Sequence, residues 1–419
     1  MKVILPKNII DIMSKINNSG FDAHLVGGCV RDLIMGRTPN DWDIATNAST
    51  DAIKSIFPKS YDTGLKHGTV TVLYDRTKAE ITTYRKESVY SDHRRPDFVI
   101  FTDSLTEDLS RRDFTVNSIA WHPKKGLTDP FNGLQDINKG IIRCVGDPKQ
   151  RFSEDALRML RAVRFSAQLG FDIEDKTFSA IRDCWQDLSY VSAERIQSEL
   201  NKILDSKEPH KLSMLWETGL SRVIFPEIDK LDNEWTKYAV HFSNHRNKRI
   251  ILLSLLFITT FKDLAGQYYK RILKKLRYDN KTIKSIGLLI NCFDGLGAYS
   301  CRNLRKAVTE FGKEKVINTI EINAAMKKLP YDVSASIIDD LTTNVTPVKA
   351  SISGTDLKNA GLCDGPGIGK MLSLLLHCIF EKPELNNFDT LLLLAKAISK
   401  SRIFVSFNHE INNRKGQPD

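Results

Sequence analysis

Hydrophobic and polar positions follow two different patterns along the chain, and the change comes near residue 150. In the first part, short β-branched runs predict strands at 69–74, 79–84 and 97–101. Helical spacing at 7–18 and 50–57 places helices among these strands. After the change, helical spacing continues to the C-terminus. The pattern therefore predicts an α/β head followed by an all-helical remainder.

Capping and stop residues support several of these helices. Ser49 stands where a helix N-cap is expected. The run FSEDALRMLRAVRFSAQLG, residues 152–170, keeps apolar residues at helical spacing and stops at Gly170. The apolar runs at 250–261 and 391–398 predict buried helices, and the longer one is too short to span a bilayer.

Composition limits which cellular compartments and which classes of partner fit the chain. Lys and Arg exceed Asp and Glu by 61 to 51, which favours a polyanionic partner such as nucleic acid, although many basic proteins bind none. The seven cysteines form no CxxC pair, which favours free thiols in a reducing compartment. The N-terminal stretch lacks a signal peptide. We expect a cytoplasmic protein with no membrane segment, and no protein partner is implied.

Two carboxylates lie one residue apart in the segment DWDIAT. Asp41 and Asp43 point to the same face if the segment is a strand. Such a pair is costly unless a cation lies between its members, and hard oxygen ligands suit Mg²⁺. A solvated pair at a strand end is the alternative, since the pattern is short and common.

Glycines and an arginine precede this pair. Gly27 and Gly28 let the backbone approach a phosphate closely, and Arg31 supplies a charged donor fork. Together with the carboxylates they predict a site for a triphosphate and a metal. The glycine-rich segment at 364–371 fails the Walker pattern and is interpreted as a turn that starts a helix.

The chain resembles the class II tRNA nucleotidyltransferases, which are the CCA-adding enzymes and their poly(A) polymerase relatives. Five ordered segments carry the resemblance: GGCVRD at 27–32 with the DWD at 41–43, RRDFTVNSIA at 111–120, DPFNGLQDI at 129–137, EDALRMLRAVRF at 154–165 and SAERIQSELNKIL at 192–204. The resemblance implies an α+β fold with a polymerase-β-like nucleotidyltransferase head and a helical neck, body and tail. The expected boundaries are 1–146 for the head, 147–210 for the neck, 211–330 for the body and 331–419 for the tRNA-binding tail.

The resemblance also implies roles for residues of the head. Asp41 and Asp43 would bind Mg²⁺, and Gly28 and Arg31 would contact the nucleoside triphosphate. Glu80, on a strand expected beside that of the Asp pair, takes the place of the third catalytic carboxylate. An exposed strand glutamate is the alternative for this residue.

Other residues of the second segment have expected supporting roles. Arg112 would help to bind the nucleotide, and Asp113 and Asn117 occupy positions that contact the sugar or support the structure.

The fourth segment offers a means of choosing the base. Asp155, Arg158, Arg161 and Arg164 recur every three residues, so a helix would place them on one stripe. A carboxylate accepts from the amino group of cytosine or adenine, and an arginine donates to the ring nitrogen, whereas uracil and guanine offer the reverse pattern. The resemblance gives this role to the Asp155 and Arg158 positions, and the other two arginines would bind phosphate or hold the pair rigid. Arginines on a solvated face are the alternative.

Two further segments fit RNA extension. The charged stretch at 85–98 resembles the flexible loop that CCA-adding enzymes need for the terminal A, with an ordinary surface loop as the alternative. The helix expected at 269–284 is basic, and Lys270, Lys274 and Lys275 are candidates for contacts with RNA phosphates, although a charge run is usually a solvated face.

The predicted function is stepwise, template-independent addition of C, C and A to tRNA 3′ ends from CTP and ATP, with release of pyrophosphate. Three alternatives remain at this point: an A-adding tRNA nucleotidyltransferase, a bacterial poly(A) polymerase, and a non-catalytic RNA-binding protein of the same fold. The sequence contains no His-Asp dipeptide, so no HD phosphohydrolase domain is expected.

Overall fold

The structure is a computed structural model that describes residues 5–64, 68–87 and 99–400. Its contacts divide the chain into two compact units. The first comprises Met1–Leu252 with Arg271–Asp279, and the second comprises Leu253–Lys270 with Asn280–Asp419. The four-part division into head, neck, body and tail stays a prediction.

The first unit begins with an α/β head built on a mixed sheet of seven strands. In spatial order the strands are β3 (Ser60–Gly64), β4 (Thr69–Tyr74), β5 (Thr77–Thr83), β2 (Asp43–Thr46), β1 (Ala23–Val26), β8 (Ala120–His122) and β9 (Gly126–Thr128). β2 and β5 run parallel, and the other neighbours in this sheet are antiparallel. The predicted strand at 69–74 is confirmed, and the one predicted at 79–84 corresponds to β5, which begins two residues earlier and ends one residue earlier.

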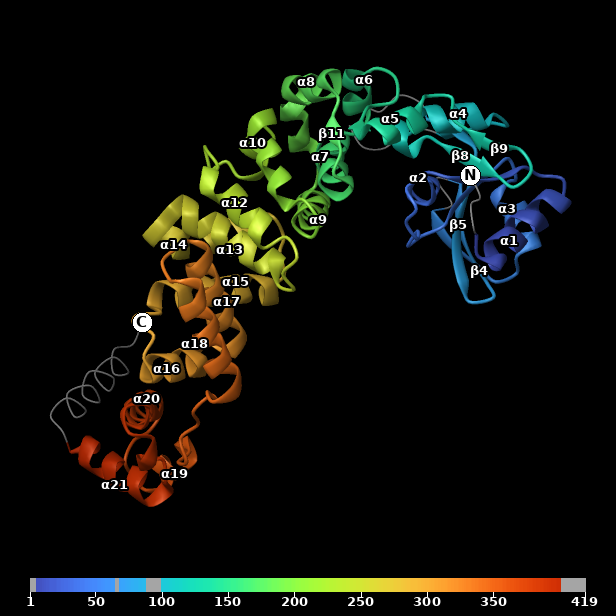
Figure 1. Cartoon of the computed structure of the whole chain (residues 1–419). Helices are drawn as coiled ribbons and strands as arrows, with labels where there is room; N and C mark the ends of the chain where they lie inside the picture. The colour runs from blue at the N-terminus through green and yellow to red at the C-terminus, as the bar shows by residue number, and fades with distance from the viewer. Residues whose placement is uncertain (1–4, 65–67, 88–98, 401–419) are drawn as a thin grey trace, which may run out of the picture. The chain divides into compact units, whose positions relative to one another are not determined.

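Helices α1 (Lys7–Asn18) and α3 (Thr50–Ile56) pack together against the sheet (Figure 1). α1 buries Ile9, Ile12, Met13 and Ile16, the spacing of one helix face. Both helices match their predicted ranges closely. The side chain of Ser49 accepts a hydrogen bond from the Ala52 N–H, which confirms the predicted N-cap of α3.

The remaining head elements surround the segments that resemble the family. They are α2 (Gly28–Ile34), α4 (Leu105–Ser110), the short 3₁₀ helix η2 (Thr115–Asn117) and α5 (Gly133–Lys139). Leu105 and Leu109 of α4 pack against Val26, Ala45 and Ala120 of the sheet, so α4 is anchored beside strands β1 and β2.

The charged stretch at 85–98 begins as a strand. β6 (Arg85–Glu87) pairs antiparallel with β7 (Val99–Phe101) in a separate two-stranded sheet. The expectation of a loop is therefore wrong for its first three residues. The remainder, 88–98, lies outside the described residues. The role of this segment in the switch from C to A therefore stays a prediction.

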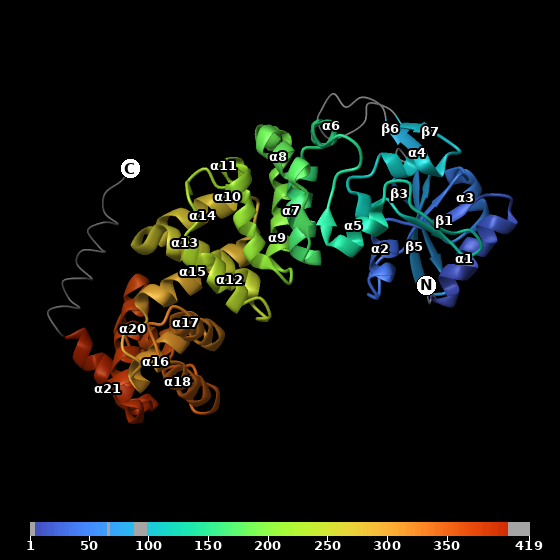
Figure 2. The same ribbon diagram turned by 45° about the horizontal axis from the view of Figure 1, so that its top comes forward.

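Helices follow the head, as expected (Figure 2). A short parallel pair, β10 (Ile141–Ile142) with β11 (Asp172–Ile173), interrupts them. Over the described residues, which end at 400, the prediction of an all-helical remainder therefore holds apart from β11. The helices of this part of the first unit are α6 (Pro148–Glu154), α7 (Leu157–Leu169), α8 (Asp175–Cys184), η3 (Trp185–Tyr190), α9 (Ala193–Leu204), η4 (Pro209–Ser213), α10 (Met214–Thr218), α11 (Ser221–Ile224) and α12 (Asn233–His241).

The run at 152–170 is not one helix, which corrects the sequence prediction. α6 ends at Glu154, and Asp155 has extended dihedral angles of −141° and 102° before α7 begins at Leu157. α7 does end at Gly170, which has a positive φ of 76°, as the pattern predicted. Apolar spacing persists across the break because both helices bury their apolar faces, so periodicity alone did not show it.

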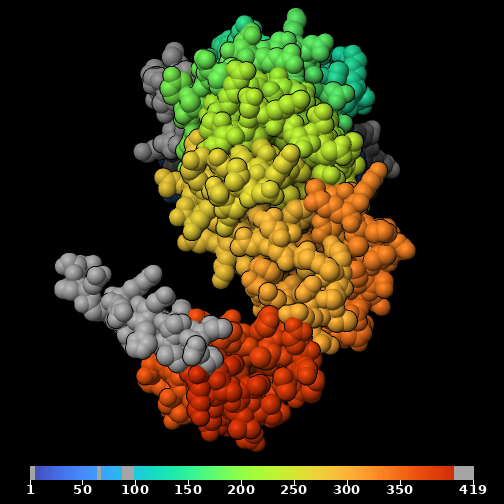
Figure 3. Space-filling model, turned by 90° about the vertical axis from the view of Figure 1, so that its left-hand side faces the viewer, coloured from blue at the N-terminus to red at the C-terminus, as the bar shows by residue number. Residues whose placement is uncertain are grey.

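The helices that complete the chain are α13 (Lys248–Phe261), η5 (Lys262–Leu264), α14 (Ala265–Lys275), α15 (Asn280–Gly295), α16 (Cys301–Phe311), α17 (Lys313–Ala325), α18 (Tyr331–Thr343), α19 (Gly354–Asn359), α20 (Pro366–Glu381), η6 (Pro383–Leu385) and α21 (Phe388–Ser399). Within the second unit, one apolar cluster joins α15 to α18 and another joins α19 to α21. Their surfaces are drawn in orange and red in Figure 3. The segment at 364–371 does start a helix, because α20 begins at Pro366.

The apolar run at 250–261 lies in α13, where Leu252, Leu255 and Phe257 are fully buried. Residues Lys248–Lys275 are long and apolar enough for a membrane span by length and composition, and 50% of the apolar window is buried inside the protein. Core helices of soluble proteins meet the same criterion. The prediction of a buried helix is therefore confirmed for this run.

Candidate active site

A polar cleft of about 980 Å³ lies between the sheet of the head and helices α7 and α9 of the first unit. It brings together all ten catalytic and nucleotide-binding candidates predicted from the sequence. They are Gly28, Arg31, Asp41, Asp43, Glu80, Arg112, Asp155, Arg158, Arg161 and Arg164. Asp113 and Asn117 also line the cleft. The roles of these residues remain predictions, but they share one site.

The predicted carboxylates meet where β2 and β5 run side by side. Asp43 begins β2 and lies directly opposite Glu80 of β5, and the Glu80 N–H donates to the Trp42 carbonyl over 2.8 Å. Asp41 lies two residues before the strand begins and is exposed. The expectation that Glu80 lies beside the Asp pair is confirmed, although this does not test its catalytic role.

The electrostatics of Asp43 suit a cation-binding carboxylate. Burial raises the pKa of Asp43, and while the nearby Arg112 opposes this shift, Glu80 and Asp41 increase it. Like charges therefore crowd this end of the cleft, and a divalent cation there would relieve the repulsion. Among the described residues, no group of three or more His, Cys, Asp or Glu side chains forms a ready-made metal cluster. Mg²⁺ commonly takes one or two protein carboxylates and completes its shell with substrate phosphates and water, so the donor set fits this ion.

The glycine turn makes room for an arginine beside these carboxylates. Gly27 has a positive φ of 76° and is the N-cap of α2. A Cβ on Gly27 would lie 2.8 Å from Nη1 of Arg112 and 3.8 Å from Oδ2 of Asp43. Gly27 is therefore required both by its backbone conformation and by the close approach of Arg112.

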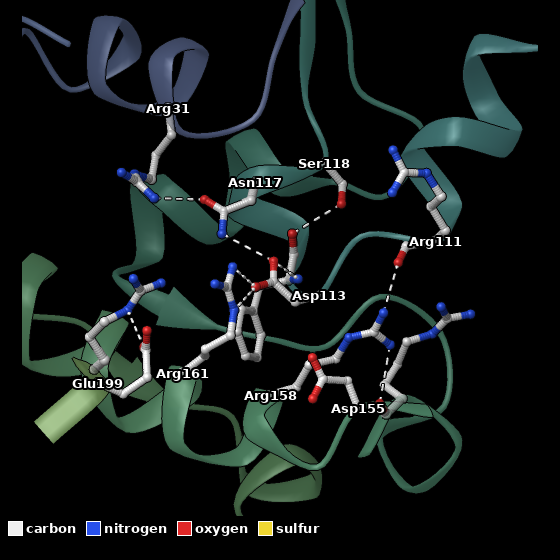
Figure 4. Close-up of polar contacts among 12 residues, drawn as sticks. Arg31, Arg111, Asp113, Asn117, Ser118, Asp155, Arg158, Arg161 and Glu199 are labelled. Atoms are coloured by element: carbon white, nitrogen blue, oxygen red, sulfur yellow. Dashed lines mark hydrogen bonds and ion pairs between the residues drawn. The ribbon is translucent and has the colours of Figure 1, made fainter. Parts of the chain in front are cut away.

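A chain of hydrogen bonds crosses the cleft from the head to α7 (Figure 4). Arg31 donates from Nη1 to the Asn117 side chain over 2.6 Å, and the Asn117 amide donates to Asp113 over 3.2 Å. Arg161 of α7 donates to the other Asp113 oxygen over 2.8 Å and 2.5 Å. Asp113 thus fixes one arginine directly and a second through Asn117.

Asp113 stays ionised within this network. Burial alone would raise its pKa, but the guanidinium of Arg161 and the hydrogen bond from Asn117 lower the pKa of Asp113 to about 2. The charge of Asp113 also raises the pKa of Arg161, against the effect of burial. The two groups therefore form a charged, hydrogen-bonded pair at neutral pH.

The predicted base-reading residues have different partners. Asp155 accepts a hydrogen bond from Arg195 of α9 over 2.8 Å and another from the Leu157 N–H over 3.1 Å. Arg158 forms an ion pair with Glu154 and donates to the carbonyl of Arg111 over 3.3 Å (Figure 4). The prediction that Asp155 shares a helical stripe with the arginines is wrong, because it lies in the break between α6 and α7. Only the three arginines share a helix.

Arg164 is held at the buried side of the cleft. It forms an ion pair with Glu199 of α9 over 3.0 Å, and its guanidinium carbon lies 3.8 Å from the centre of the Phe165 ring. Burial, with Arg161 adding to the effect, lowers the pKa of Arg164 to about 10. The guanidinium therefore remains charged at neutral pH and attracts anions into the cleft.

Several residues of the cleft were not predicted from the sequence. They are Lys78, Arg111, Phe165, Gln168, Arg195 and Lys202. Lys78 precedes Glu80 by two residues on β5, so strand alternation places both on one face. Arg195 lies in the segment at 192–204. This segment contributes to the cleft because α9 packs beside α7, a contact that the sequence pattern does not show. The basic candidates Lys270, Lys274 and Lys275 are exposed on α14 and do not line the cleft.

Two family models match the first unit. The Poly A polymerase head domain matches residues 23–143, and a domain described as "Probable RNA and SrmB- binding site of polymerase A" matches residues 170–231. The first match contains the carboxylates and the glycine turn. The segment at 154–165 lies between the two matches.

Curated relatives and solved structures match nearly the whole chain. A CCA-adding enzyme of Lactobacillus johnsonii is 36% identical over 96% of this chain and 97% of the relative, and one of Lactococcus lactis subsp. cremoris is 37% identical over 91% and 94%. The CCA-adding enzyme of Bacillus stearothermophilus in complex with CTP aligns with a TM-score of 0.74 and 28% identity over 98% of this chain and 99% of that one. The Thermotoga maritima enzyme complexed with tRNA_CCA shares the fold, with a TM-score of 0.65 and 21% identity over 94% and 96%. The fold and the sequence similarity over nearly the full length place the chain in the family of CCA-adding enzymes, which are tRNA nucleotidyltransferases.

Proposed function

We propose that this chain adds C, C and A in turn to the 3′ end of tRNA, using CTP and ATP and no template, and releases pyrophosphate at each step. One observation carries the proposal. The carboxylates Asp41, Asp43 and Glu80 share a cleft with arginines from both the head and α7. Negative groups at one end and positive groups along the walls are what a metal-bound triphosphate requires. The names of the relatives support tRNA, CTP and ATP as the substrates.

The metal in this proposal is Mg²⁺, held by Asp41 and Asp43. When bound, it supplies the positive charge that stabilises the attacking oxygen and the leaving phosphates. Glu80, opposite Asp43, accepts the proton of the RNA 3′-hydroxyl or completes the metal shell. The raised pKa of Asp43 supports a site built to hold a cation.

The arginines bind and orient the triphosphate. Arg31 and Arg112 approach it from the head, and Arg161 and Arg164 approach it from α7. The Gly28 backbone at the first turn of α2 contacts the phosphates from the head. Because Asp113 and Asn117 connect Arg31 to Arg161, the two sides of the cleft are held at a fixed separation. Such positioning is the main source of catalysis when the chemistry consists of an in-line phosphoryl displacement.

Asp155 and Arg158 select the base. The carboxylate of Asp155 has about four acceptor positions, and the hydrogen bonds from Arg195 and Leu157 use two of them. The carboxylate retains the capacity to accept from the amino group of cytosine or adenine. Arg158 donates to the adjacent ring nitrogen. Uracil and guanine would leave buried groups mismatched, at about 1–3 kcal/mol each.

We also place the protein in the cytoplasm. All seven cysteines are free, and most are buried. Free thiols are typical of proteins in a reducing compartment, where tRNA maturation requires this activity.

The decisive assay supplies tRNA that lacks its 3′ CCA, with each nucleotide alone and in pairs. Three additions, two C followed by one A, support the proposal. A long A tail would instead identify a poly(A) polymerase. One A on a CC-ended tRNA, with no growth on the bare acceptor, would identify an A-adding enzyme. No extension with any nucleotide, despite RNA binding, would identify a non-catalytic protein.

A further inference from the structure

A fully buried carboxylate lies behind the arginines of the cleft. Asp108 of α4 has no exposed surface and does not line the cleft itself. Its Oδ1 accepts hydrogen bonds from Nε and Nη2 of Arg111 over 2.9 Å and 2.8 Å. Its Oδ2 accepts a hydrogen bond from Nη2 of Arg112 over 3.3 Å. One carboxylate therefore holds two consecutive arginines that line the cleft.

We call Asp108 with Arg111 and Arg112 the clamp, and the spacing of the three residues along the chain explains it. Arg111 and Arg112 follow Asp108 by three and four residues. At this spacing, side chains at the end of α4 lie on the same side as Asp108. Burial alone would raise the pKa of Asp108, but the guanidiniums of Arg111 and Arg112 keep that pKa below its usual value. Leu109, next in the chain, packs against the sheet, so the clamp rests on a rigid support.

Through Arg112, Asp108 affects the end of the cleft where the carboxylates lie. Its Nη1 lies beside Gly27, at 2.8 Å from where a Cβ would be, and its charge acts on the pKa of Asp43. Arg112 therefore stands between the clamp and the end of the cleft where the triphosphate is expected.

Through Arg111, Asp108 also affects Arg158, one of the two residues proposed to select the base. Its backbone carbonyl accepts a hydrogen bond from Nη2 of Arg158 over 3.3 Å (Figure 4). The two contacts to Asp108 fix the Arg111 side chain and, with it, the conformation of the backbone that presents this carbonyl. A change at Asp108 thus reaches Arg158 through one intervening residue.

We propose that Asp108 is a positioning residue that couples triphosphate binding by Arg112 to base selection by Arg158. The inference rests on the proposed function and extends it. Asp108 touches neither substrate, and it acts by fixing the directions of two neighbouring arginines. Its loss should therefore impair nucleotide affinity and nucleotide choice together.

The test replaces Asp108 by Asn, which keeps the shape and removes the charge. We expect the Kd for CTP and for ATP to rise about tenfold, as for the loss of a charge-assisted hydrogen bond. We also expect the preference for CTP over UTP in kcat/KM to fall about tenfold or more. The matched control is Asp136→Asn, another buried carboxylate of the head, which accepts from Arg143 over 3.0 Å and from Thr115 over 2.7 Å outside the cleft. It should lose comparable stability, while its Kd and preference stay within about twofold of wild type.

A double-mutant cycle separates positioning from general loosening. In an Arg112→Gln background, Asp108→Asn should change the Kd for CTP by less than about twofold, because the contact through which Asp108 acts on the triphosphate is already gone, whereas its contact with Arg111 remains and the preference for CTP over UTP should still fall. Independent, additive effects would overturn the proposal, as would equal behaviour of the Asp108 and Asp136 variants. If wild-type protein itself fails to extend tRNA, the proposed function fails, whereas the Kd cycle for CTP still tests the clamp.

Discussion

Asp43 and Glu80 lie directly opposite each other on the parallel strands β2 and β5, and both face the polar cleft. In a parallel pair the side chains of opposed residues emerge on the same face of the sheet. Two carboxylates 37 residues apart in the sequence are thereby brought together by backbone pairing alone. The strand register, rather than any loop, sets their spacing.

Replacing Asp41 and Asp43 by alanine should abolish nucleotide addition. We expect the rate of single-turnover C addition to fall at least about 10³-fold, because the groups proposed to hold the metal are gone. Asp62→Asn, on exposed strand β3, is the control and should extend tRNA at the wild-type rate. Extension by the double variant at the wild-type rate would contradict the assignment of the site.

Gly27→Ala should impair nucleotide binding more than it impairs folding. The added Cβ displaces Arg112, and the positive φ of 76° adds strain of about 1 kcal/mol. Gly20→Ala is a matched control, since Gly20 has a φ of 89° and open space around its Cβ position. Both variants should lose similar stability in urea unfolding, but only Gly27→Ala should raise the KM for CTP. Equal KM values in the two variants would exclude a role for the close approach of Arg112 to Gly27.

Asp155→Ala should relax nucleotide choice. The variant loses the acceptor for the base amino group, so the preference for CTP over UTP in kcat/KM should fall about tenfold or more. The Kd for tRNA should change little. Asp175→Ala, on the exposed first turn of α8, controls for loss of charge. Unchanged preference in the Asp155 variant would show that another group reads the base.

The head should lose stability in mild acid because of His24. Burial, reinforced by the neighbouring His122, lowers the pKa of His24 to about 4 from an ordinary 6.5, while Asp22 acts in the opposite direction and Lys125 adds to the lowering. Its Nδ1 lies 2.8 Å from the Tyr84 hydroxyl. The unfolded chain binds this proton more readily, so stability present above pH 6.5 is lost as the pH falls toward 4.

Urea unfolding at several pH values measures this effect. The His24 contribution to the free energy of unfolding should fall by about 2 kcal/mol between pH 7 and pH 5. A His24→Gln variant should show a correspondingly shallower dependence over that range. Parallel pH profiles for the two proteins would mean that folding does not lower the pKa of His24.

The exposed lysines of α14 should contribute to RNA affinity without affecting chemistry. Replacing Lys270, Lys274 and Lys275 by Gln should weaken tRNA binding and lower the slope of log K against log salt by about 0.7–0.9 for each lost phosphate contact. The rate at saturating tRNA should stay constant. A triple replacement of the exposed Lys59, Lys124 and Lys139 in the head is the charge-matched control. Equal salt slopes in the two variants would remove α14 from the RNA interface.

The sequence predicted elements best where local chemistry decides them. Ser49 caps α3 and Gly170 ends α7, each for reasons contained within a few residues. The adjacency of Glu80 to Asp43 was predicted from the family resemblance, which places a third carboxylate on a strand beside that of the Asp pair.

The sequence predicted less where packing between distant segments decides. Asp155 leaves the helix although the apolar spacing continues, since both flanking helices are stabilised by burial rather than by an unbroken backbone. Arg195 reaches the cleft, and Glu199 reaches Arg164, only because α9 packs on α7. Asp108 matters only through the two arginines that it holds. No local pattern distinguishes such residues from ordinary surface charges.

The break at Asp155 separates two kinds of motion. The backbone of a helix moves as a unit, so the Cα atoms of Arg158, Arg161 and Arg164 keep their relative positions in α7. A side chain at a joint changes direction when one pair of backbone dihedral angles changes. Under the proposed roles, a change at this joint would re-aim the Asp155 carboxylate from a pyrimidine to the larger purine ring, while Arg161 and Arg164, which are assigned to the triphosphate, keep their positions on α7.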